Sequence, residues 1–299
     1  MIRAFVIGRE RKGRQIPEAV ADVAERLRVA GWEVDSAVVK RKREMRRLTR
    51  RAVKDGRDVV VAVGGDGAVL QVATGLADTT VALGIIPTGT GNLLAGNLHI
   101  PDGRDEAVAT VLNGRPRRID MGRVEIGRKK RAFTVACGIG FDAKVMDVTG
   151  QEQKLRWGKL AYLTNAVRQT GNLQNGAHEI TLDGVHSTMQ AAQVFIANFG
   201  KMLPIVQPRR RIRGDDGLLD VIVVRAAGPL TGLLAGWEAL MQKDLGESSG
   251  GHIFRAQARE VRVRSDPHRL VETDGSVVGE TPITVSIQPR ALTVIVPHR

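Results

Sequence analysis

The chain of 299 residues is poor in cysteine, in aromatic residues and in long apolar runs. Its one cysteine, Cys137, excludes an intrachain disulfide and a cysteine-rich zinc site, and it is compatible with a reducing cytoplasm. Aromatic residues make up only 3%, so the cores must be built from Val, Leu, Ile and Ala. The longest apolar runs, such as 59–63, are far shorter than the roughly 20 residues that a membrane-spanning helix needs.

Positive charge is in large excess. The chain carries 45 Lys and Arg residues against 32 Asp and Glu residues, which gives a formal net charge of +13. Such an excess favours polyanionic partners, which are nucleic acid, anionic lipid headgroups or phosphorylated small molecules. Composition alone does not choose among the three.

The first 120 residues alternate apolar strand patterns with helical patterns. Expected strands lie at 3–8, 32–39, 58–63 and 80–86, and expected helices lie at 17–30, 45–54 and 68–76. Strands that alternate with helices indicate a parallel sheet that is covered on both faces. The first part of the chain is therefore expected to be an α/β domain.

From Asp120 onward the pattern changes to short alternating segments, which indicate an antiparallel β domain. These segments lie at 131–136, 179–182, 189–197, 219–224, 260–264, 282–287 and 292–297, and two helices are expected at 159–169 and 230–242. We place the boundary near Gly122, so that the expected domains are 1–122 and 123–287. Two domains also agree with the length, since a domain usually has roughly 100–200 residues.

A glycine-rich loop follows the most apolar expected strand. The residues after 59–63 are Gly64, Gly65, Asp66 and Gly67, and a helical pattern comes next. Glycines allow the backbone to approach a ligand closely, and the free N–H groups at a helix start suit phosphate. The other interpretation is an ordinary tight turn between a strand and a helix.

A second loop of similar kind follows the next expected strand. It reads Pro87-Thr88-Gly89-Thr90-Gly91-Asn92 and supplies hydroxyl, amide and glycine positions. Two such loops on adjacent strands would form a two-sided phosphate site. The Walker pattern is absent because no Gly-Lys-Ser/Thr follows, and the first turn lacks the Rossmann Gly-x-Gly-x-x-Gly.

These two loops in series resemble the diacylglycerol kinase catalytic domain family. That family includes bacterial lipid kinases and sphingosine kinases, with NAD kinases and phosphofructokinases as distant relatives. Further segments match in order and spacing, namely 138–143 (Gly-Ile-Gly-Phe-Asp-Ala), 154–162 (Lys-Leu-Arg-Trp-Gly-Lys-Leu-Ala-Tyr), 216–220 (Asp-Gly-Leu-Leu-Asp) and 273–275 (Thr-Asp-Gly). The resemblance thus covers nearly the whole chain.

The resemblance implies a two-domain kinase with an active site in the cleft. Its first domain would be similar to those of NAD kinase and phosphofructokinase, and its second would be similar to a β-sandwich, with residues 288–299 returning to the first. ATP would contact residues of both loops, namely Gly64, Gly65, Asp66, Gly67, Ala68, Thr88, Gly89, Thr90 and Asn92. Asp66 would orient Mg²⁺ or the phosphates, and Asp274 would accept or orient the proton of the hydroxyl.

The resemblance also implies a structural Mg²⁺ near Arg213, Asp216 and Leu218, bound partly through backbone carbonyls. Spacing alone favours a different interpretation of Asp215-Asp216-Gly217, which is a simple turn. Both interpretations stay open at this point.

Several positions depart from the family pattern. The first strand normally ends in Asn-Pro and a glycine loop, whereas residues 8–14 read Gly-Arg-Glu-Arg-Lys-Gly-Arg. Basic side chains or the Gly13 backbone would replace that phosphate contact. The usual Thr after the first loop is Ala68, and the usual Glu three residues later is Gln71. The Asp that often follows Asn92 is Leu93, at a position that varies within the family.

The departure at Ser276 bears on catalysis. The family usually has a Glu there, directly after Asp-Gly, and that Glu is itself a candidate catalytic base. Three assignments stay open in its absence: Glu272 substitutes for it, Glu280 substitutes for it, or Asp274 acts alone.

Two basic clusters suggest where acidic partners bind. In residues 40–51, eight of the twelve side chains are basic, and the second cluster is 209–213 (Arg-Arg-Arg-Ile-Arg). We interpret the first as a surface for anionic phospholipid, since a kinase whose substrate lies in a membrane needs peripheral attachment. A solvated helix face is the alternative. No nucleic acid partner is expected because no aromatic ladder accompanies either cluster.

The expected protein is thus an ATP- and Mg²⁺-dependent lipid kinase that converts diacylglycerol to phosphatidic acid. It would be cytoplasmic with peripheral membrane association, and a homodimer is left open. One alternative is a kinase for a sphingoid base or another hydroxylated lipid. Another is a catalytically impaired nucleotide- or lipid-binding regulator, which the residues at 68, 71 and 276 motivate.

Overall fold

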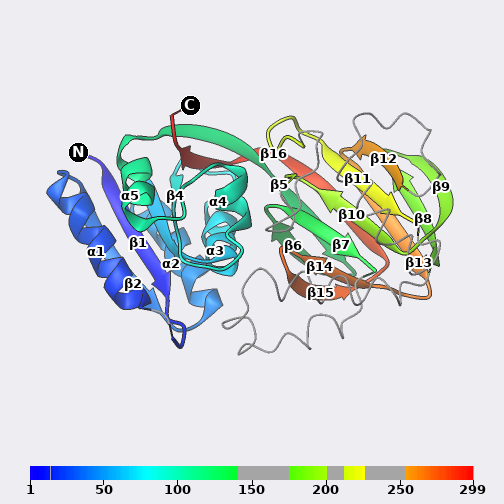
Figure 1. Cartoon of the computed structure of the whole chain (residues 1–299), viewed down its shortest axis with the longest axis horizontal. Helices are drawn as coiled ribbons and strands as arrows, with labels where there is room; N and C mark the ends of the chain where they lie inside the picture. The colour runs from blue at the N-terminus through cyan, green and yellow to red at the C-terminus, as the bar shows by residue number, and fades with distance from the viewer. Residues whose placement is uncertain (14, 141–174, 201–211, 226–252, 299) are drawn as a thin grey trace. The chain divides into compact units, whose positions relative to one another are not determined.

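The structure is a computed structural model that describes residues 1–13, 15–140, 175–200, 212–225 and 253–298 (Figure 1). The chain forms two compact units, one of residues 1–120 with 289–299 and one of residues 121–288. The expected helices at 159–169 and 230–242 lie outside the described residues. In the part of the chain that is described, no helix is both long and apolar enough to cross a bilayer.

Unit 1 is built on a parallel sheet with the strand order β2-β1-β3-β4-β16. Its strands are β1 (Arg3–Arg9), β2 (Glu33–Val39), β3 (Val59–Gly64), β4 (Ala82–Pro87) and the last part of β16 (Ile283–Val296). Its helices are α1 (Ile16–Val29), α2 (Lys42–Lys54), α3 (Asp66–Leu76), α4 (Leu93–Asn97) and α5 (Arg104–Asn113).

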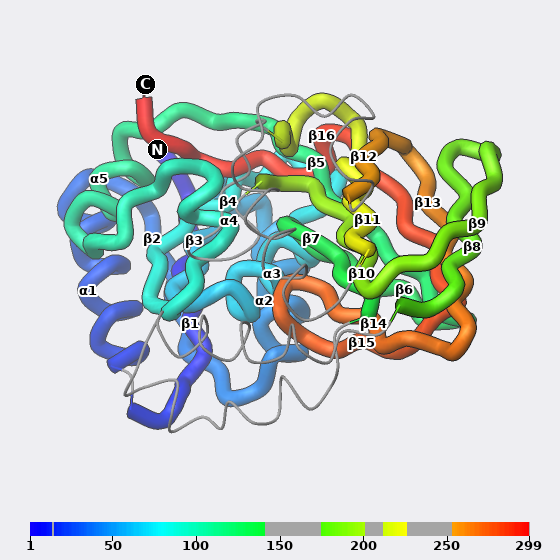
Figure 2. The backbone as a smooth tube through the Cα atoms, turned by 45° about the vertical axis from the view of Figure 1, so that its right-hand side comes forward, coloured from blue at the N-terminus to red at the C-terminus, as the bar shows by residue number. Residues whose placement is uncertain are grey.

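Helices cover both faces of this sheet, as Figure 2 shows. α1 contacts α5, and α2 contacts α3, so each pair forms one layer. The strand β3 lies between the layers, and Val60 to Val63 are completely buried. Continuous apolar sequence in β3 is what a strand covered on both faces requires.

The strand order places a topological switch point between β1 and β3. From β1 the chain passes outward to β2, and it then returns to add β3 and β4 on the other side. Ligands of open α/β sheets bind at the carboxyl ends of the strands at such a point. Here those ends carry Gly8–Arg9 and Gly64, where the first glycine-rich loop begins.

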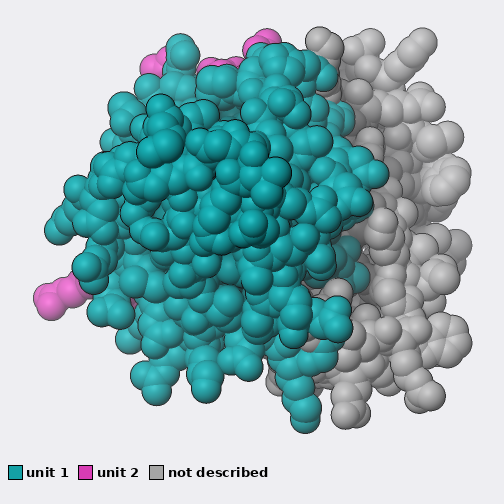
Figure 3. Space-filling view, turned by 90° about the vertical axis from the view of Figure 1, so that its left-hand side faces the viewer, with its two compact units in different colours: residues 1–120, 289–299 teal, residues 121–288 magenta. Residues whose placement is uncertain are grey.

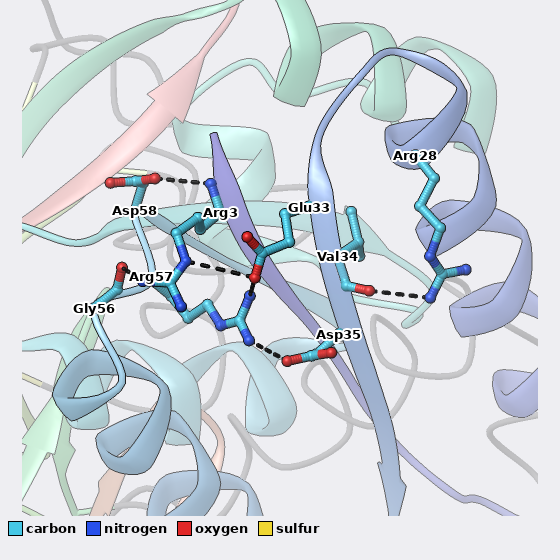
Figure 4. Close-up of polar contacts among 8 residues, drawn as sticks. All are labelled: Arg3, Arg28, Glu33, Val34, Asp35, Gly56, Arg57 and Asp58. Atoms are coloured by element: carbon cyan, nitrogen blue, oxygen red, sulfur yellow. Dashed lines mark hydrogen bonds and ion pairs between the residues drawn. The ribbon is translucent and has the colours of Figure 1, made fainter. Parts of the chain in front are cut away.

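The opposite, amino-terminal ends of β1, β2 and β3 are held by ion pairs (Figure 4). The guanidinium of Arg57 is bonded to Glu33 and Asp35, and its side chain is only 11% exposed. The carboxylate of Asp58 accepts a hydrogen bond from the backbone N–H of Arg3 at 2.7 Å. The charged side chains at the amino-terminal ends therefore stabilise the sheet. The carboxyl ends of the strands remain the candidate ligand-binding side.

Unit 2 consists of two antiparallel sheets. One has the order β12-β11-β10-β7-β14-β15, and the other contains β16-β13-β8-β9 together with β5 and β6. The strands are β5 (Arg115–Ile126), β6 (Lys129–Phe133), β7 (Ala136–Ile139), β8 (Gly176–Leu182), β9 (Val185–Ala191), β10 (Gln193–Ala197), β11 (Leu219–Val224), β12 (Ile253–Ala258), β13 (Glu260–Asp266), β14 (Leu270–Thr273) and β15 (Ser276–Glu280).

Side chains from both sheets share one apolar core in unit 2. Ile139, Val194 and Val221 come from the first sheet, and Ile180 and Val263 come from the second. The expected fold class, a parallel α/β domain followed by an antiparallel β-sandwich-like domain, is confirmed.

Four expected strands differ in detail. Residues 131–136 are not one strand, since β6 ends at Phe133 and β7 begins at Ala136. Residues 189–197 divide into β9 and β10 at Ala192, whose N–H donates to the carbonyl of Val224. Conversely, 282–287 and 292–297 belong to the single long strand β16. The alternation of apolar and polar residues is a local pattern. It therefore does not show where a strand ends or changes its pairing partner.

Candidate active site

The two glycine-rich loops lie against each other in unit 1. Gly64 pairs with Pro87 at the ends of β3 and β4, and its carbonyl accepts the N–H of Thr88 at 3.1 Å. One step further on, a Cβ added to Gly65 would lie 3.0 Å from the Cα of Gly89. The glycines at these two positions therefore allow the loops to touch backbone to backbone.

Asp66 joins the first loop to the second. Its Oδ1 accepts the backbone N–H of Leu93, the first residue of α4, at 2.6 Å. A Cβ at Gly91 would come within 2.8 Å of the Asp66 Oδ2, so glycine leaves the room that the carboxylate occupies. Asp66 thus anchors the start of α4, and its charge lies between the two loops.

Asn92 closes the second loop. It adopts a left-handed conformation (φ 47°), which Asn tolerates better than most residues. Its Oδ1 accepts the N–H of Gly89 at 3.0 Å, and its Nδ2 donates to the carbonyl of Gly89 and to Asp102, each at 3.1 Å. The amide therefore shapes the loop that carries Thr88 and Thr90.

The outward side of the two loops is formed by few groups. Gly67 and Thr90 are exposed, and Gly65 and Thr88 are half-buried. Ala68, by contrast, is buried against Gly64, where an added Cβ would lie 2.5 Å from the Ala68 Cβ. What remains open is the start of α3, where backbone N–H groups lack intrahelical acceptors and suit an anion.

Asp274 lies in unit 2, at the turn between β14 and β15. Asp274 and Gly275 both have positive φ (44° and 75°), as the two central residues of a type I′ hairpin do, and Asp-Gly is a favoured sequence for that turn. Its carboxylate accepts four hydrogen bonds at 2.7–3.1 Å, from the N–H groups of Thr134, Val135 and Ala136 and from the Thr134 hydroxyl. These bonds explain why β6 stops before β7 starts.

Burial raises the pKa of Asp274, and the four hydrogen bonds act against that rise. Every acceptor position of the carboxylate is engaged in holding segment 134–136. Asn198 holds the same segment from the other side, since its Nδ2 donates to the Thr134 carbonyl at 2.8 Å. Asp274 and Asn198 therefore hold segment 134–136 between them.

Glu272 lies two residues before Asp274 on β14. It is half-buried, and no hydrogen bond joins its carboxylate to another described residue. Burial, together with the charge of Asp274, raises its pKa to about 7. Glu280 and Ser276 are exposed. A carboxyl group with this pKa can exchange a proton near neutral pH.

Arg213, Asp216 and Leu218 form a turn that precedes β11. The Asp216 Oδ1 accepts the N–H of Leu218 at 3.1 Å, and the Arg213 Nε lies 3.3 Å from Asp215. No group of three His, Cys, Asp or Glu side chains gathers anywhere in the described ranges. These contacts hold the turn together, and the Mg²⁺ expected there stays a prediction, with Asp216 and backbone carbonyls as its ligands.

The structure thus gathers the predicted nucleotide residues in one place in unit 1, while Asp274 and the 213–218 turn belong to unit 2. Sequence reasoning did not single out Asp102 or Thr134, which orient Asn92 and hold Asp274. No local sequence pattern marks either residue, because Asp102 contacts Asn92 in another loop and Thr134 contacts Asp274, which is distant in sequence.

Comparison with known proteins agrees with this geometry. Residues 3–124 match the family model "Diacylglycerol kinase catalytic domain", and residues 135–296 match "YegS C-terminal NAD kinase beta sandwich-like domain". A Mycobacterium tuberculosis protein named diacylglycerol kinase is 29% identical over 287 residues, which is 91% of this chain and 88% of that protein.

An uncharacterized protein of Synechocystis is 27% identical over 247 residues, which is 81% of this chain but only 56% of that protein. A crystal structure of a diacylglycerol kinase from Bacillus anthracis has the same fold, with a TM-score of 0.74 at 20% identity, covering 99% of this chain and 96% of that one.

The α/β unit with its paired loops and the β-sandwich-like unit are together the architecture of a lipid kinase. Residues 3–124 belong to the diacylglycerol kinase catalytic domain family and residues 135–296 to the YegS C-terminal domain family, and the chain is a kinase.

Proposed function

We propose that this kinase transfers the γ-phosphate of ATP to a lipid hydroxyl and that diacylglycerol is the acceptor, giving phosphatidic acid. The observation that carries the proposal is the contact of the two glycine-rich loops, joined by Asp66 at the carboxyl ends of β3 and β4. Phosphoryl transfer requires positioning and charge neutralisation more than covalent chemistry.

The residues present suit a nucleotide. The exposed start of α3 offers N–H groups around Gly67, and the Thr90 hydroxyl lies exposed on the second loop. Asp66 is a carboxylate that would hold the Mg²⁺ of a bound nucleotide, since Mg²⁺ takes one or two carboxylates together with substrate phosphates. The cation would supply neutralisation of the phosphate charge.

We further propose that Glu272 receives the proton of the lipid hydroxyl and that Asp274 keeps the neighbouring segment 134–136 in place. Asp274 has no acceptor position left, whereas the Glu272 carboxylate lacks a hydrogen-bond partner among the described residues. Glu272 must be ionised to accept a proton, so the rate of phosphoryl transfer should rise with pH through a midpoint of about 7.

The experiment measures lipid-dependent ADP release in mixed micelles with diacylglycerol, a sphingoid base and a lipid without a free hydroxyl. Turnover with diacylglycerol above the other two supports the proposal, and turnover with the sphingoid base alone would assign that acceptor instead. ATP binding without stimulation by any lipid would favour the regulator.

E272Q should lose the rising limb of the pH profile of turnover, and E280Q should keep it. The reverse result would move the role of proton acceptor to Glu280.

The exposed face of α2 supports the proposal of a membrane-associated enzyme. Six basic side chains of the described residues line a groove of about 450 Å³: Arg43, Arg46, Arg47, Arg50, Arg51 and Lys54. Of these six side chains, only Arg51 has an ion-pair partner among the described residues, Asp55 at 3.6 Å. On the other side of the helix, Met45, Thr49 and Ala52 are buried. We propose that this α2 groove binds the headgroups of anionic phospholipid.

Near a membrane each basic residue contributes roughly 1 kcal/mol, and salt weakens the attraction. Sedimentation with phosphatidylcholine vesicles that contain phosphatidylglycerol should therefore pellet the protein at low salt, and vesicles without phosphatidylglycerol should not. R47E/R50E should lose this binding, and R128E/R131E, a matched reversal of exposed charges on the β5–β6 hairpin, should retain it. Equal loss of vesicle binding in both variants would show that the binding depends on net charge and not on the α2 groove. Tighter binding to RNA than to vesicles would reject the membrane as partner.

A further inference from the structure

Lys42, the first residue of α2, lies beside the first glycine-rich loop. A Cβ built on Gly67 would be 3.8 Å from the Lys42 Nζ and 3.9 Å from its Cε, and apart from the chain neighbours and the backbone of α3 no other atom of the described residues comes within 4 Å of that position. Both residues are exposed. The ammonium group therefore lies at the open side of the loop, where a ligand would arrive.

Lys42 is distinct from the α2 groove. The groove is lined by six side chains from position 43 to position 54, and Lys42 is not among them. The basic run at 40–51 thus divides into a groove along the helix and one lysine that turns toward α3. Sequence alone assigned the whole run to a single membrane surface.

The position of this charge is unfavourable for stability. The start of α3 is the positive end of a helix dipole, where a cation costs free energy and an anion gains it. No carboxylate of the described residues forms an ion pair with Lys42. The Asp66 carboxylate in the first turn of α3 offsets part of this cost, and a bound phosphate would offset more of it.

The segment at the end of β1 also departs from the family pattern, in which Asn-Pro and a glycine loop follow the first strand. Residues 8–13 contain no Asn-Pro, and Gly8 is occupied with packing, since a Cβ there would lie 2.6 Å from Val20 and 2.7 Å from Ile16. Gly8 therefore serves the contact of β1 with α1.

We propose that the Lys42 ammonium binds the phosphate chain of the nucleotide at the Gly65–Gly67 loop, and that it serves there as a cation in addition to the loop's N–H groups. This rests on the proposed function of that loop as the ATP site. Lysine contacts phosphate as a point charge with three donors, and hydrogen bonds between charged groups are about twice as strong as neutral ones.

The test compares the binding of ATP, tripolyphosphate and adenosine to the full chain by isothermal titration calorimetry. K42M should weaken the affinity for ATP and tripolyphosphate about 10-fold, as expected for loss of one charge-assisted contact, and should leave adenosine unchanged. K42R, which keeps the charge, should recover part of the loss. K129M removes an exposed lysine of β6 that no ion pair holds, and it should bind ATP as the wild type does.

ATP affinity that is equal in K42M and the wild type would overturn the role of Lys42 and leave the ATP site standing. Equal weakening of adenosine would also overturn it, because the contact would then not be to phosphate. A wild-type chain that binds no ATP would refute the proposed function itself, and the Lys42 proposal with it. Thermal unfolding of each variant separates loss of binding from loss of fold.

Discussion

Asp274 shows how much of the site depends on single side chains. An aspartate in a left-handed turn conformation holds three consecutive backbone N–H groups and one hydroxyl of segment 134–136. In the same way Asp66 and Asn92 use their polar atoms to join and close the two loops of unit 1. Residues that the sequence analysis expects to contact ligands thus also build the framework around the site.

We expect D274N to destabilise unit 2 by about 2–4 kcal/mol, because an amide group turns one acceptor oxygen into a donor that faces backbone N–H groups. Chemical denaturation followed by circular dichroism measures the change. D216N serves as control, since the exposed Asp216 accepts a single hydrogen bond from the described residues. Wild-type stability of D274N together with loss of turnover would assign Asp274 to catalysis and not to positioning.

The glycines of the first loop should separate into packing and binding positions. G64A should destabilise the protein by about 1–3 kcal/mol, because its Cβ would lie 2.5 Å from the buried Cβ of Ala68. G67A should fold as the wild type does, since only Lys42 approaches that position, but its methyl group would stand where phosphate arrives. Differential scanning fluorimetry with and without ATP distinguishes the two. Unchanged ATP stabilisation in G67A would contradict the placement of the phosphates.

At the scale of elements, boundaries follow partners that lie far away in the sequence. α2 begins at Lys42, three residues before the expected start, because the Glu44 side chain accepts the N–H of Arg41 and completes a helix start that apolar periodicity does not show. α5 at 104–113 was not expected, although acidic residues in its first turn and Gly114 at its end are helix signals.

The sheet of β9, β8 and β13 contains a buried histidine that links all three strands. His178 is fully buried, with its Nδ1 2.9 Å from the Ser265 hydroxyl and its Nε2 3.1 Å from the Ala191 carbonyl. The neutral ring suits both bonds when Nε2 carries the proton. Burial lowers the pKa of His178, and the nearby charge of Arg269 acts in the same direction.

Because the folded state holds His178 neutral, the unfolded chain binds more protons once the pH falls below about 6.5, and stability is lost on that side. We expect the free energy of unfolding to drop between about pH 7 and pH 5, and H178Q to show a smaller drop. The exposed His186 provides the matched control, H186Q, which should retain the wild-type slope. Equal slopes in H178Q and the wild type would exclude His178 as the source.

At the scale of the whole molecule, the last residues of the chain complete the first unit. Residues 289–299 belong to unit 1, where Thr293 and Val294 of β16 pair in parallel with Ala82 and Leu83 of β4. Ala291, Leu292 and Val294 are buried, and the Ala291 carbonyl accepts the N–H of Asp78. Figure 3 shows the surface of this unit, which contains residues from both chain ends.

A chain that ends at residue 288 should therefore lose the stability of unit 1, although residues 1–120 contain all its other strands. Each buried aliphatic side chain contributes about 1.5–3 kcal/mol, so the loss would approach the total stability of a typical domain. Hydrogen exchange in β3 and β4 measures it. A chain that ends at Val296 keeps the strand and should match the full chain; full protection in the shorter chain would show that the return strand is dispensable.

The sequence by itself determined the fold class, the family and the two glycine-rich loops, because apolar periodicity and turn chemistry are local properties that neighbouring residues carry. Only the tertiary structure decided what each polar group does. It turned Asp274 inward to backbone N–H groups, left Glu272 half-buried with a raised pKa, and separated Lys42 from the α2 groove. These are properties of distance and burial between residues remote in sequence, and no pattern along the chain records them.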